Sequence, residues 1–212
     1  GAMAMYIDGA TGTIVHASVL ISTSSGSAGF WMGNGCVNLT LSSSTFTGGS
    51  AASAISFGDN NSGTIVLSSN TLAGGNQGFY MSNQMANSSV SIATLTISGL
   101  NTGASGIAFW NTTLVATFSY VNFADSNLGY NVDGGQLQAG SRITMSSFTG
   151  AHGGSAYEYD PNGRVDWISS AQMPAGCGAG VNVGADAPYK TIMNAVNSLN
   201  KTLSADTCVV IR

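Results

Sequence analysis

Two aspartates are the first candidates for chemistry in this chain. Asp133 and Asp160 each follow a tyrosine, Tyr130 and Tyr157, by three residues. If these tyrosines occupy equivalent places in neighbouring turns of a repeat, the two carboxylates lie one strand spacing, ~4.8 Å, apart. Carboxylates that close share a proton, act as a general acid and base, or bind Ca²⁺. The alternative interpretation is that both are turn residues facing solvent.

Few other residues could support this pair. Glu158, Arg142 and Arg164 come from the same stretch of sequence, and Glu158 is a weaker candidate for a catalytic carboxylate. The two histidines, His16 and His152, are far apart in the sequence, and we interpret both as surface or turn residues. Apart from Ca²⁺ on the aspartates, we expect no metal site and no cofactor.

Three aromatic residues are candidates for binding a ligand. Trp31, Tyr80 and Trp110 follow or lie within predicted strands. If their rings face outward, they form a strip on which sugar rings can stack. Packing in the core or in turns is the alternative for each of them.

An internal repeat of 25 or 26 residues must position all of these side chains. It shows as quartets in which the first three positions are mostly apolar. In chain order, the quartets are Leu39, Leu41, Phe46 and Gly48; Ile65, Leu67, Leu72 and Gly74; Val90, Ile92, Ile97 and Gly99; Ala116, Phe118, Phe123 and Asp125; and Ser141, Ile143, Phe148 and Gly150. The third position of the quartet extends the repeat back to Ile21 and forward to Met173.

A second apolar pair follows each third position. The pairs are Phe30/Met32, Ile55/Phe57, Phe79/Met81, Ile107/Phe109, Tyr130/Val132 and Tyr157/Tyr159. Their alternation predicts strands with one buried face. Because no helical segment separates these strands, equivalent strands must stack in parallel. The sequence therefore predicts an all-β protein, a parallel β-helix of about seven coils. An antiparallel sandwich or barrel is the alternative, but it has no reason to keep a constant period.

Stacked coils should also align polar residues at their turns. Four residues after the first member of successive pairs come Asn34, Asp59, Asn83 and Asn111. Asn and Asp tolerate left-handed backbone angles, and stacked amides bond from coil to coil. We predict a structural ladder here, with a sugar-binding row as the alternative.

Composition narrows the class of protein. Charged residues make up 7% of the chain and hydrophobic residues 43%, so the chain is poor in helix formers but can bury a core. A net charge of -4 with only five Lys and Arg leaves no basic patch for nucleic acid. No run approaches the roughly 18 apolar residues of a membrane span. The three cysteines form no recognisable framework; a Cys177–Cys208 bridge and three buried thiols are the alternatives.

The end of the chain differs from the repeat. We expect an expression scar at 1–4, the β-helix at 5–175, a linker at 176–186, and a helix plus strand at 187–212. One apolar helix face is formed by Ile192, Ala195, Val196 and Leu199. A short strand, 208–211, follows it.

This tail resembles the opening of pectate-lyase-like right-handed β-helix proteins, pectin methylesterases included. The matching residues are Tyr189-Lys190-Thr191-Ile192, Ala195-Val196 and Val209-Val210-Ile211. In those families an amphipathic helix caps the first coil of a right-handed solenoid. Here it ends the chain, which implies either the start of a following β-helix unit or a cap that folds back over an open edge. The families' catalytic motifs are absent, and 164–168, Arg-Val-Asp-Trp-Ile, is only distantly similar to one of them.

We therefore expect a non-catalytic module of a large exported bacterial protein, secreted or at the cell surface. It would serve as a stalk or adhesin, with glycans or other copies of the same protein as partners. The alternative is a polysaccharide-active lyase, esterase or hydrolase that uses Asp133 and Asp160. An ice- or mineral-binding face is a third hypothesis, which the mixture of Ser, Asn, Ala and Tyr at outward positions disfavours.

Overall fold

The structure, a computed structural model, describes residues 5–10, 14–17, 20–22, 27–33, 35–83, 89–125, 128–150, 156–167, 179–183 and 207–211. At 14–17, 20–22, 156–158, 166–167, 179–183 and 207–211 it describes the backbone alone. All of the described regular structure is β-strand.

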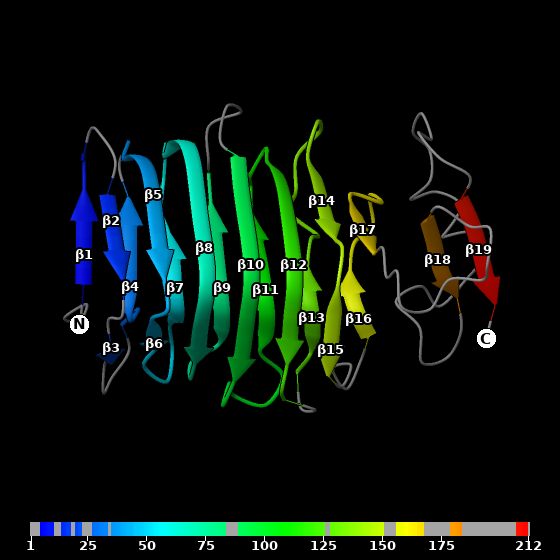
Figure 1. Ribbon diagram of the computed structural model, residues 1–212, viewed down its shortest axis with the longest axis horizontal. Coiled ribbons are helices and arrows are strands. Elements are labelled where there is room, and N and C mark those ends of the chain that lie inside the picture. Colours follow the sequence, from blue (N-terminus) through cyan, green and yellow to red (C-terminus); the bar gives the residue numbers. More distant parts are fainter. Residues whose placement is uncertain are drawn as a thin grey trace.

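The first sheet has seven strands, all parallel to their neighbours (Figure 1). In spatial order they are β1 (Met5–Asp8), β4 (Phe30–Gly33), β7 (Ser53–Phe57), β9 (Gln77–Ser82), β11 (Ser105–Trp110), β13 (Tyr130–Asp133) and β16 (Ala156–Tyr159). Spatial order follows chain order, with one strand from each coil.

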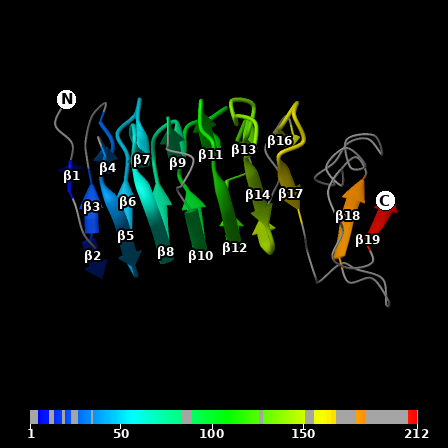
Figure 2. The ribbon, with the colours of Figure 1, turned by 90° about the horizontal axis from the view of Figure 1, so that it is seen from above.

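The second sheet has ten strands and is also parallel. They are β2 (Ile14–Ala17), β3 (Leu20–Ser22), β5 (Val37–Ser42), β6 (Thr45–Thr47), β8 (Ser62–Ala73), β10 (Ser89–Ser98), β12 (Val115–Phe123), β14 (Arg142–Met145), β15 (Phe148–Gly150) and β17 (Val165–Trp167). The chain alternates between the two sheets, so the predicted parallel β-solenoid is confirmed (Figure 2). Side chains are described through about five coils, from β4 to β15.

Long strands of the second sheet bend halfway along their length. In β10, Ala93 and Thr94 are both exposed, whereas Leu95 is buried again. The bend residues, with φ angles of 49°, 55°, 57° and 56°, are Ser43, Ser69, Thr94 and Tyr120. Two consecutive outward residues reset the alternation, so both halves of each strand turn an apolar face toward the core.

Phenylalanine rings form the centre of the core. The rings in contact, with centroids 5.3 to 6.4 Å apart, are Phe30, Phe46, Phe57, Phe79, Phe109 and Phe118. Phe79 contacts three of the others and is completely buried. Buried amides bind the backbone at the corners; Asn61 Oδ1 accepts a hydrogen bond from the backbone N–H of Cys36, a free buried cysteine.

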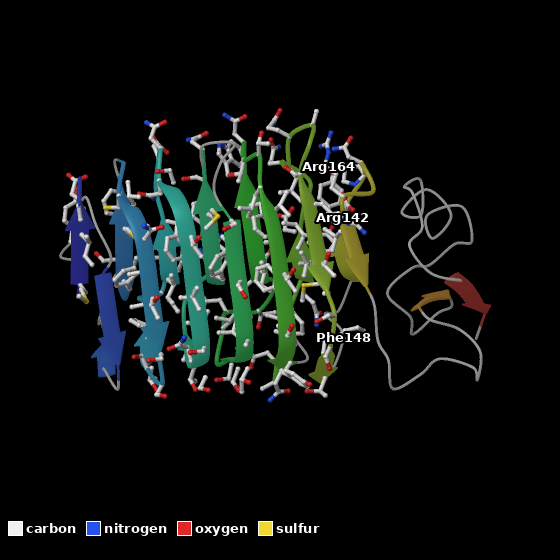
Figure 3. All side chains as sticks on the ribbon, turned by 45° about the horizontal axis from the view of Figure 1, so that its top comes forward. Arg142, Phe148 and Arg164 are labelled. Atoms are coloured by element: carbon white, nitrogen blue, oxygen red, sulfur yellow. The ribbon has the colours of Figure 1, made fainter. Side chains whose placement is uncertain are left out.

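The predicted register holds from Leu39 to Phe123 in the second sheet but is wrong in the next coil. Ile143 lies opposite Ala116, and Phe148 lies opposite Val121 rather than Phe123. Figure 3 labels Phe148 in this coil, together with Arg142. The alignment is therefore displaced by two residues. A slip of two residues keeps the same face of a strand inward, so the apolar pattern alone does not exclude it.

The predicted register of the first sheet is also wrong in its last coils. Val132, not Tyr130, lies opposite Ile107. In the next coil Tyr130 lies opposite Ala156, so the predicted equivalence of Tyr130 with Tyr157 is wrong by one residue. Turns of unequal length between the sheets absorb these differences without disturbing the stacking.

A separate two-stranded parallel sheet follows in the chain. It pairs β18 (Ala179–Val183) with β19 (Thr207–Ile211). β19 contains the predicted strand, whereas β18 lies inside the stretch expected to be a linker, because Val181 and Val183 supply an alternating apolar pattern there. The predicted scar and helix, together with Met173 and Cys177, lie outside the described residues.

Candidate functional site

The outer face of the first sheet carries rows of equivalent residues. Because the strands are parallel and in register, residues opposite one another project from the same side of the sheet. One outward row consists of Tyr6, Trp31, Ser56, Tyr80, Ala108, Asp133 and Tyr159. Trp110 belongs to the neighbouring outward row, opposite Ser82.

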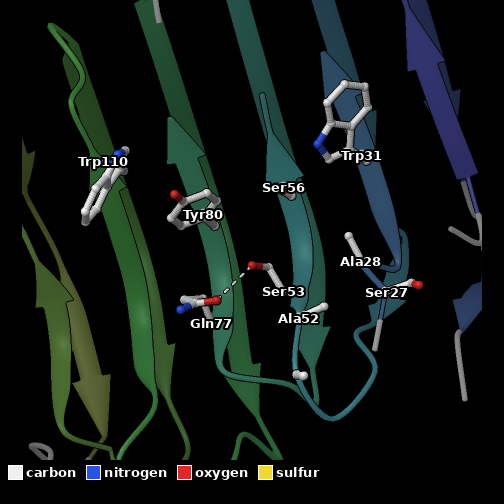
Figure 4. A pocket seen from close by; sticks show the side chains of 10 residues that line it. Ser27, Ala28, Trp31, Ala52, Ser53, Ser56, Gln77, Tyr80 and Trp110 are labelled. Atoms are coloured by element: carbon white, nitrogen blue, oxygen red, sulfur yellow. Dashed lines mark hydrogen bonds between the residues drawn. The ribbon is translucent and has the colours of Figure 1, made fainter. Parts of the chain in front are cut away.

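A groove of about 560 Å³ opens on this face (Figure 4). The groove, called the aromatic groove below, is lined by Ser27, Ala28, Trp31, Ala51, Ala52, Ser53, Ser56, Gln77, Tyr80 and Trp110. It contains all three aromatic residues that the sequence offered as ligand-binding candidates. They come from β4, β9 and β11, and small or polar residues lie between them.

The middle of the groove is polar but uncharged. Ser56 stands between Trp31 and Tyr80 in the outward row. Ser53 Oγ donates a hydrogen bond to Gln77 Oε1 at 3.0 Å, and the Gln77 amide nitrogen, a donor, lies on the side away from Ser53 (Figure 4). Hydroxyl and amide groups thus lie between aromatic walls.

Trp31 is held in place before any ligand binds. Its indole stacks on Tyr6, with ring centroids 4.5 Å apart and planes 3° from parallel. On its other side the ring lies over Gly58, where an added Cβ would be 2.6 Å from Trp31 Cζ2. The glycine therefore provides the space that the indole fills, and the ring needs little reorganisation to bind.

The other two aromatic residues differ in exposure: Tyr80 is half-buried, as Trp31 is, and Trp110 is exposed. Trp110 is 52% exposed. Burial raises the pKa of the Tyr80 hydroxyl, and the negative charge of Asp59 adds to this, whereas a hydrogen bond with Ser82 opposes it. Tyr80 is therefore neutral at physiological pH.

The two candidate aspartates do not occupy equivalent positions. Asp133 lies opposite Tyr159, so the predicted pairing with Asp160 is wrong by one residue. Asp133 Oδ1 accepts a hydrogen bond from the Gly135 N–H (3.1 Å), and Asp160 Oδ2 accepts one from the Val165 N–H (2.7 Å). Burial raises the pKa of both carboxyls. The backbone hydrogen bonds lower the pKa, but their effect is smaller than that of burial.

Among the residues expected to support the aspartates, Arg164 lies close to Asp160: burial is the largest effect on the Asp160 pKa, and the backbone N–H and the charge of Arg164 oppose it. Arg142 is exposed on β14 of the second sheet, opposite Val115. Arg164 donates to the carbonyl of Leu137. Glu158 is described by its backbone alone, opposite Val132. Within the described ranges, no three His, Cys, Asp or Glu side chains come together as a metal site would require.

The amide ladder forms at the three predicted positions that the structure describes. Asn83 Nδ2 donates to Asp59 Oδ1, and Asn111 Nδ2 donates to Asn83 Oδ1, both at 2.8 Å. Asn83 and Asn111 each have a φ of 45°, the left-handed conformation that Asn tolerates. Asn34 lies outside the described residues.

A second ladder was not predicted. Asn101 Nδ2 donates to Asn76 Oδ1 at 2.7 Å, at the other corner of the solenoid. The recurrence of Asn one repeat apart beside Gly-rich turns was available as a signal. Ser53, Ser56 and Gln77 were also missed as groove residues, because nothing in their local sequence separates them from other turn and strand residues.

The comparisons with known proteins leave the ligand to be inferred from the groove itself. No protein-family model, curated protein or solved structure matches this chain. No helix in the described part of the chain is long and apolar enough to cross a membrane. The resemblance of the tail implied a pectate-lyase-like β-helix. The structure shows the parallel β-solenoid but not that specific family.

Proposed function

We propose that this chain is a non-catalytic β-solenoid module of an exported surface protein, and that the aromatic groove binds a glycan. One observation carries the proposal: Trp31, Tyr80 and Trp110, which come from three different coils, line a single groove. The remaining coils act as the stalk that displays it.

The chemistry of the groove matches that of a sugar. A pyranose ring has apolar C–H faces and a rim of hydroxyl groups. The faces stack on aromatic rings, and the rim requires hydrogen-bonding partners such as Ser53, Ser56 and Gln77. A mostly preformed site with aromatic walls and a few polar groups is typical of a binding site.

The lining argues for binding rather than catalysis. Hydrolysis of a glycosidic bond typically uses a pair of carboxyl groups at that bond. None of the groove residues carries a carboxyl group. The carboxylate in the outward row of Trp31 and Tyr80, Asp133, lies two coils beyond Tyr80.

A glycan-array screen of the intact chain tests the proposal. We expect binding that Trp110→Ala weakens about tenfold, since one lost stacking contact of about 1.4 kcal/mol corresponds to that factor. Tyr120→Ala is the matched control, because Tyr120 is 69% exposed at the bend of the second sheet, outside the groove. Equal binding by wild type and Trp110→Ala would contradict the proposal.

The enzyme alternative has its own test. Depolymerase activity on any polysaccharide that is lost in the Asp133→Ala, Asp160→Ala double variant would replace the binding module by an enzyme.

A further inference from the structure

We infer that the aromatic groove takes an uncharged oligosaccharide chain that runs along the axis of the solenoid. This inference rests on the proposed function and adds to it the class and the direction of the ligand. It differs from what the pectate-lyase-like resemblance would suggest, because many substrates of those families are acidic polymers.

The groove offers no positive charge to an acidic sugar. Its polar groups are the neutral side chains of Ser27, Ser53, Ser56 and Gln77, the Tyr80 hydroxyl, and the indole N–H groups of Trp31 and Trp110. A uronic carboxylate that enters must lose part of its hydration. Without a cation to pair with, that loss is uncompensated.

The surroundings of the groove are negative rather than positive. The charge of Asp59 acts on Tyr80, and Asp8 accepts a hydrogen bond from the Tyr6 hydroxyl at 3.0 Å, beside Trp31. The cations among the described residues, Arg142 and Arg164, are not part of the lining. An acidic chain is therefore repelled, whereas a neutral chain meets no electrostatic cost.

The placement of the rings requires a chain rather than a single sugar. Trp31 and Tyr80 are two coils apart in one row, which separates their backbones by ~9.6 Å along the axis. Trp110 stands one coil further and two residues along the strand. No single pyranose spans that distance, so a ligand that touches all three rings has several sugars and follows the axis.

The experiment compares polymers that share a backbone and differ in charge. The intact chain is tested by affinity electrophoresis and calorimetry against hydroxyethyl cellulose and carboxymethyl cellulose, and against methyl-esterified and de-esterified homogalacturonan. We expect the neutral member of at least one pair to bind at least tenfold more tightly. We also expect less than a twofold change in its affinity between about 0.02 and 0.5 M salt, because no ion pair is screened.

A charge swap in the groove sharpens the test. Gln77→Lys should raise the affinity for the acidic polymers at least tenfold, whereas Gln77→Glu, which has the same size, should not. A cellohexaose should bind at least tenfold more tightly than cellobiose. Comparable affinities for the two would overturn the extended ligand.

The possible failures are distinguishable. If acidic polymers bind as tightly as neutral ones and Trp110→Ala abolishes both, the groove binds glycans and only the inference about charge is wrong. If no glycan binds, or if binding survives Trp110→Ala, the proposed function falls and the inference falls with it.

Discussion

The outer faces of the two sheets share one backbone arrangement, a stack of parallel strands, but carry different side chains. The first sheet presents aromatic rings around a groove. The second sheet presents small side chains, in the outward rows Thr40, Val66, Ser91, Thr117 and Thr144, and Ser42, Ser68, Ala93 and Ser119. The inward residues of both sheets form one core. A parallel solenoid thus separates the residues that hold it together from those that give each face its chemistry.

The second face lacks the regularity that the ice-binding hypothesis needs. Its first row mixes Thr, Ser and Val, and part of its hydroxyl groups bond to each other, as Ser119 Oγ does with Ser146 Oγ at 2.8 Å. These bonds link neighbouring coils. The face is suited to stabilising the stack, whereas the first face leaves its aromatic rings available.

The largest effect should come from the core that both faces share. Phe79→Ala removes a buried ring that contacts Phe57, Phe109 and Phe118, and we expect it to lower the free energy of unfolding by about 3 to 5 kcal/mol. Urea unfolding measures this. Phe79→Leu, which keeps most of the volume, should cost about 1 kcal/mol. A loss below 1 kcal/mol for Phe79→Ala would show that the two faces do not depend on one core.

A smaller effect, on glycan affinity, should show that binding depends on the face of the first sheet and not on that of the second. Gly58→Ala forces the Trp31 indole from its place, so glycan affinity should fall about tenfold while the free energy of unfolding changes by less than about 1 kcal/mol. Ser68→Ala on the second sheet is the control and should leave affinity unchanged. Tryptophan fluorescence reports the displacement of the ring. Unchanged affinity in Gly58→Ala would mean that the position of Trp31 does not matter for binding.

The smallest effect is a dependence of stability on pH. It should arise in the turn after β16, whereas binding in the groove should not depend on pH. Burial raises the pKa of Asp160 above its ordinary value, and its Oδ1 is buried without a hydrogen-bond partner among the described residues. The folded state therefore holds this proton more tightly than the unfolded state. Its stabilising effect is present below the unfolded pKa and is lost as the pH rises through the folded pKa.

Thermal unfolding at a series of pH values measures this dependence. We expect Asp160→Asn to reduce the loss of stability above about pH 4, where an ordinary Asp ionises. Glycan binding should stay constant over the same range, since the groove has no group that titrates there. A pH-dependent affinity that Asp160→Asn leaves unchanged would contradict the neutral character of the groove.

The sequence determined most of the scaffold. Its period of 25 or 26 residues and its alternation of apolar side chains predicted parallel coils, the inward residues from Leu39 to Phe123, and the Asn ladder, because stacking repeats the same local environment in every coil. From their aromatic side chains, it also identified Trp31, Tyr80 and Trp110 as candidates for binding a ligand. Trp31 and Tyr80 share one position of the repeat, as the predicted outward strip requires, but the groove that they form with Trp110 was not predictable, because Trp110 lies two residues further along its strand.

Only the tertiary structure decided the register of the last coils and the existence of the groove. Period-two alternation does not distinguish a strand from the same strand shifted by two residues, and turns of unequal length leave Asp160 one residue out of register with Asp133. The groove depends on which outward residues become lateral neighbours and on the glycines that leave room for Trp31. Contacts between coils set both, and these contacts join residues that are distant in the sequence.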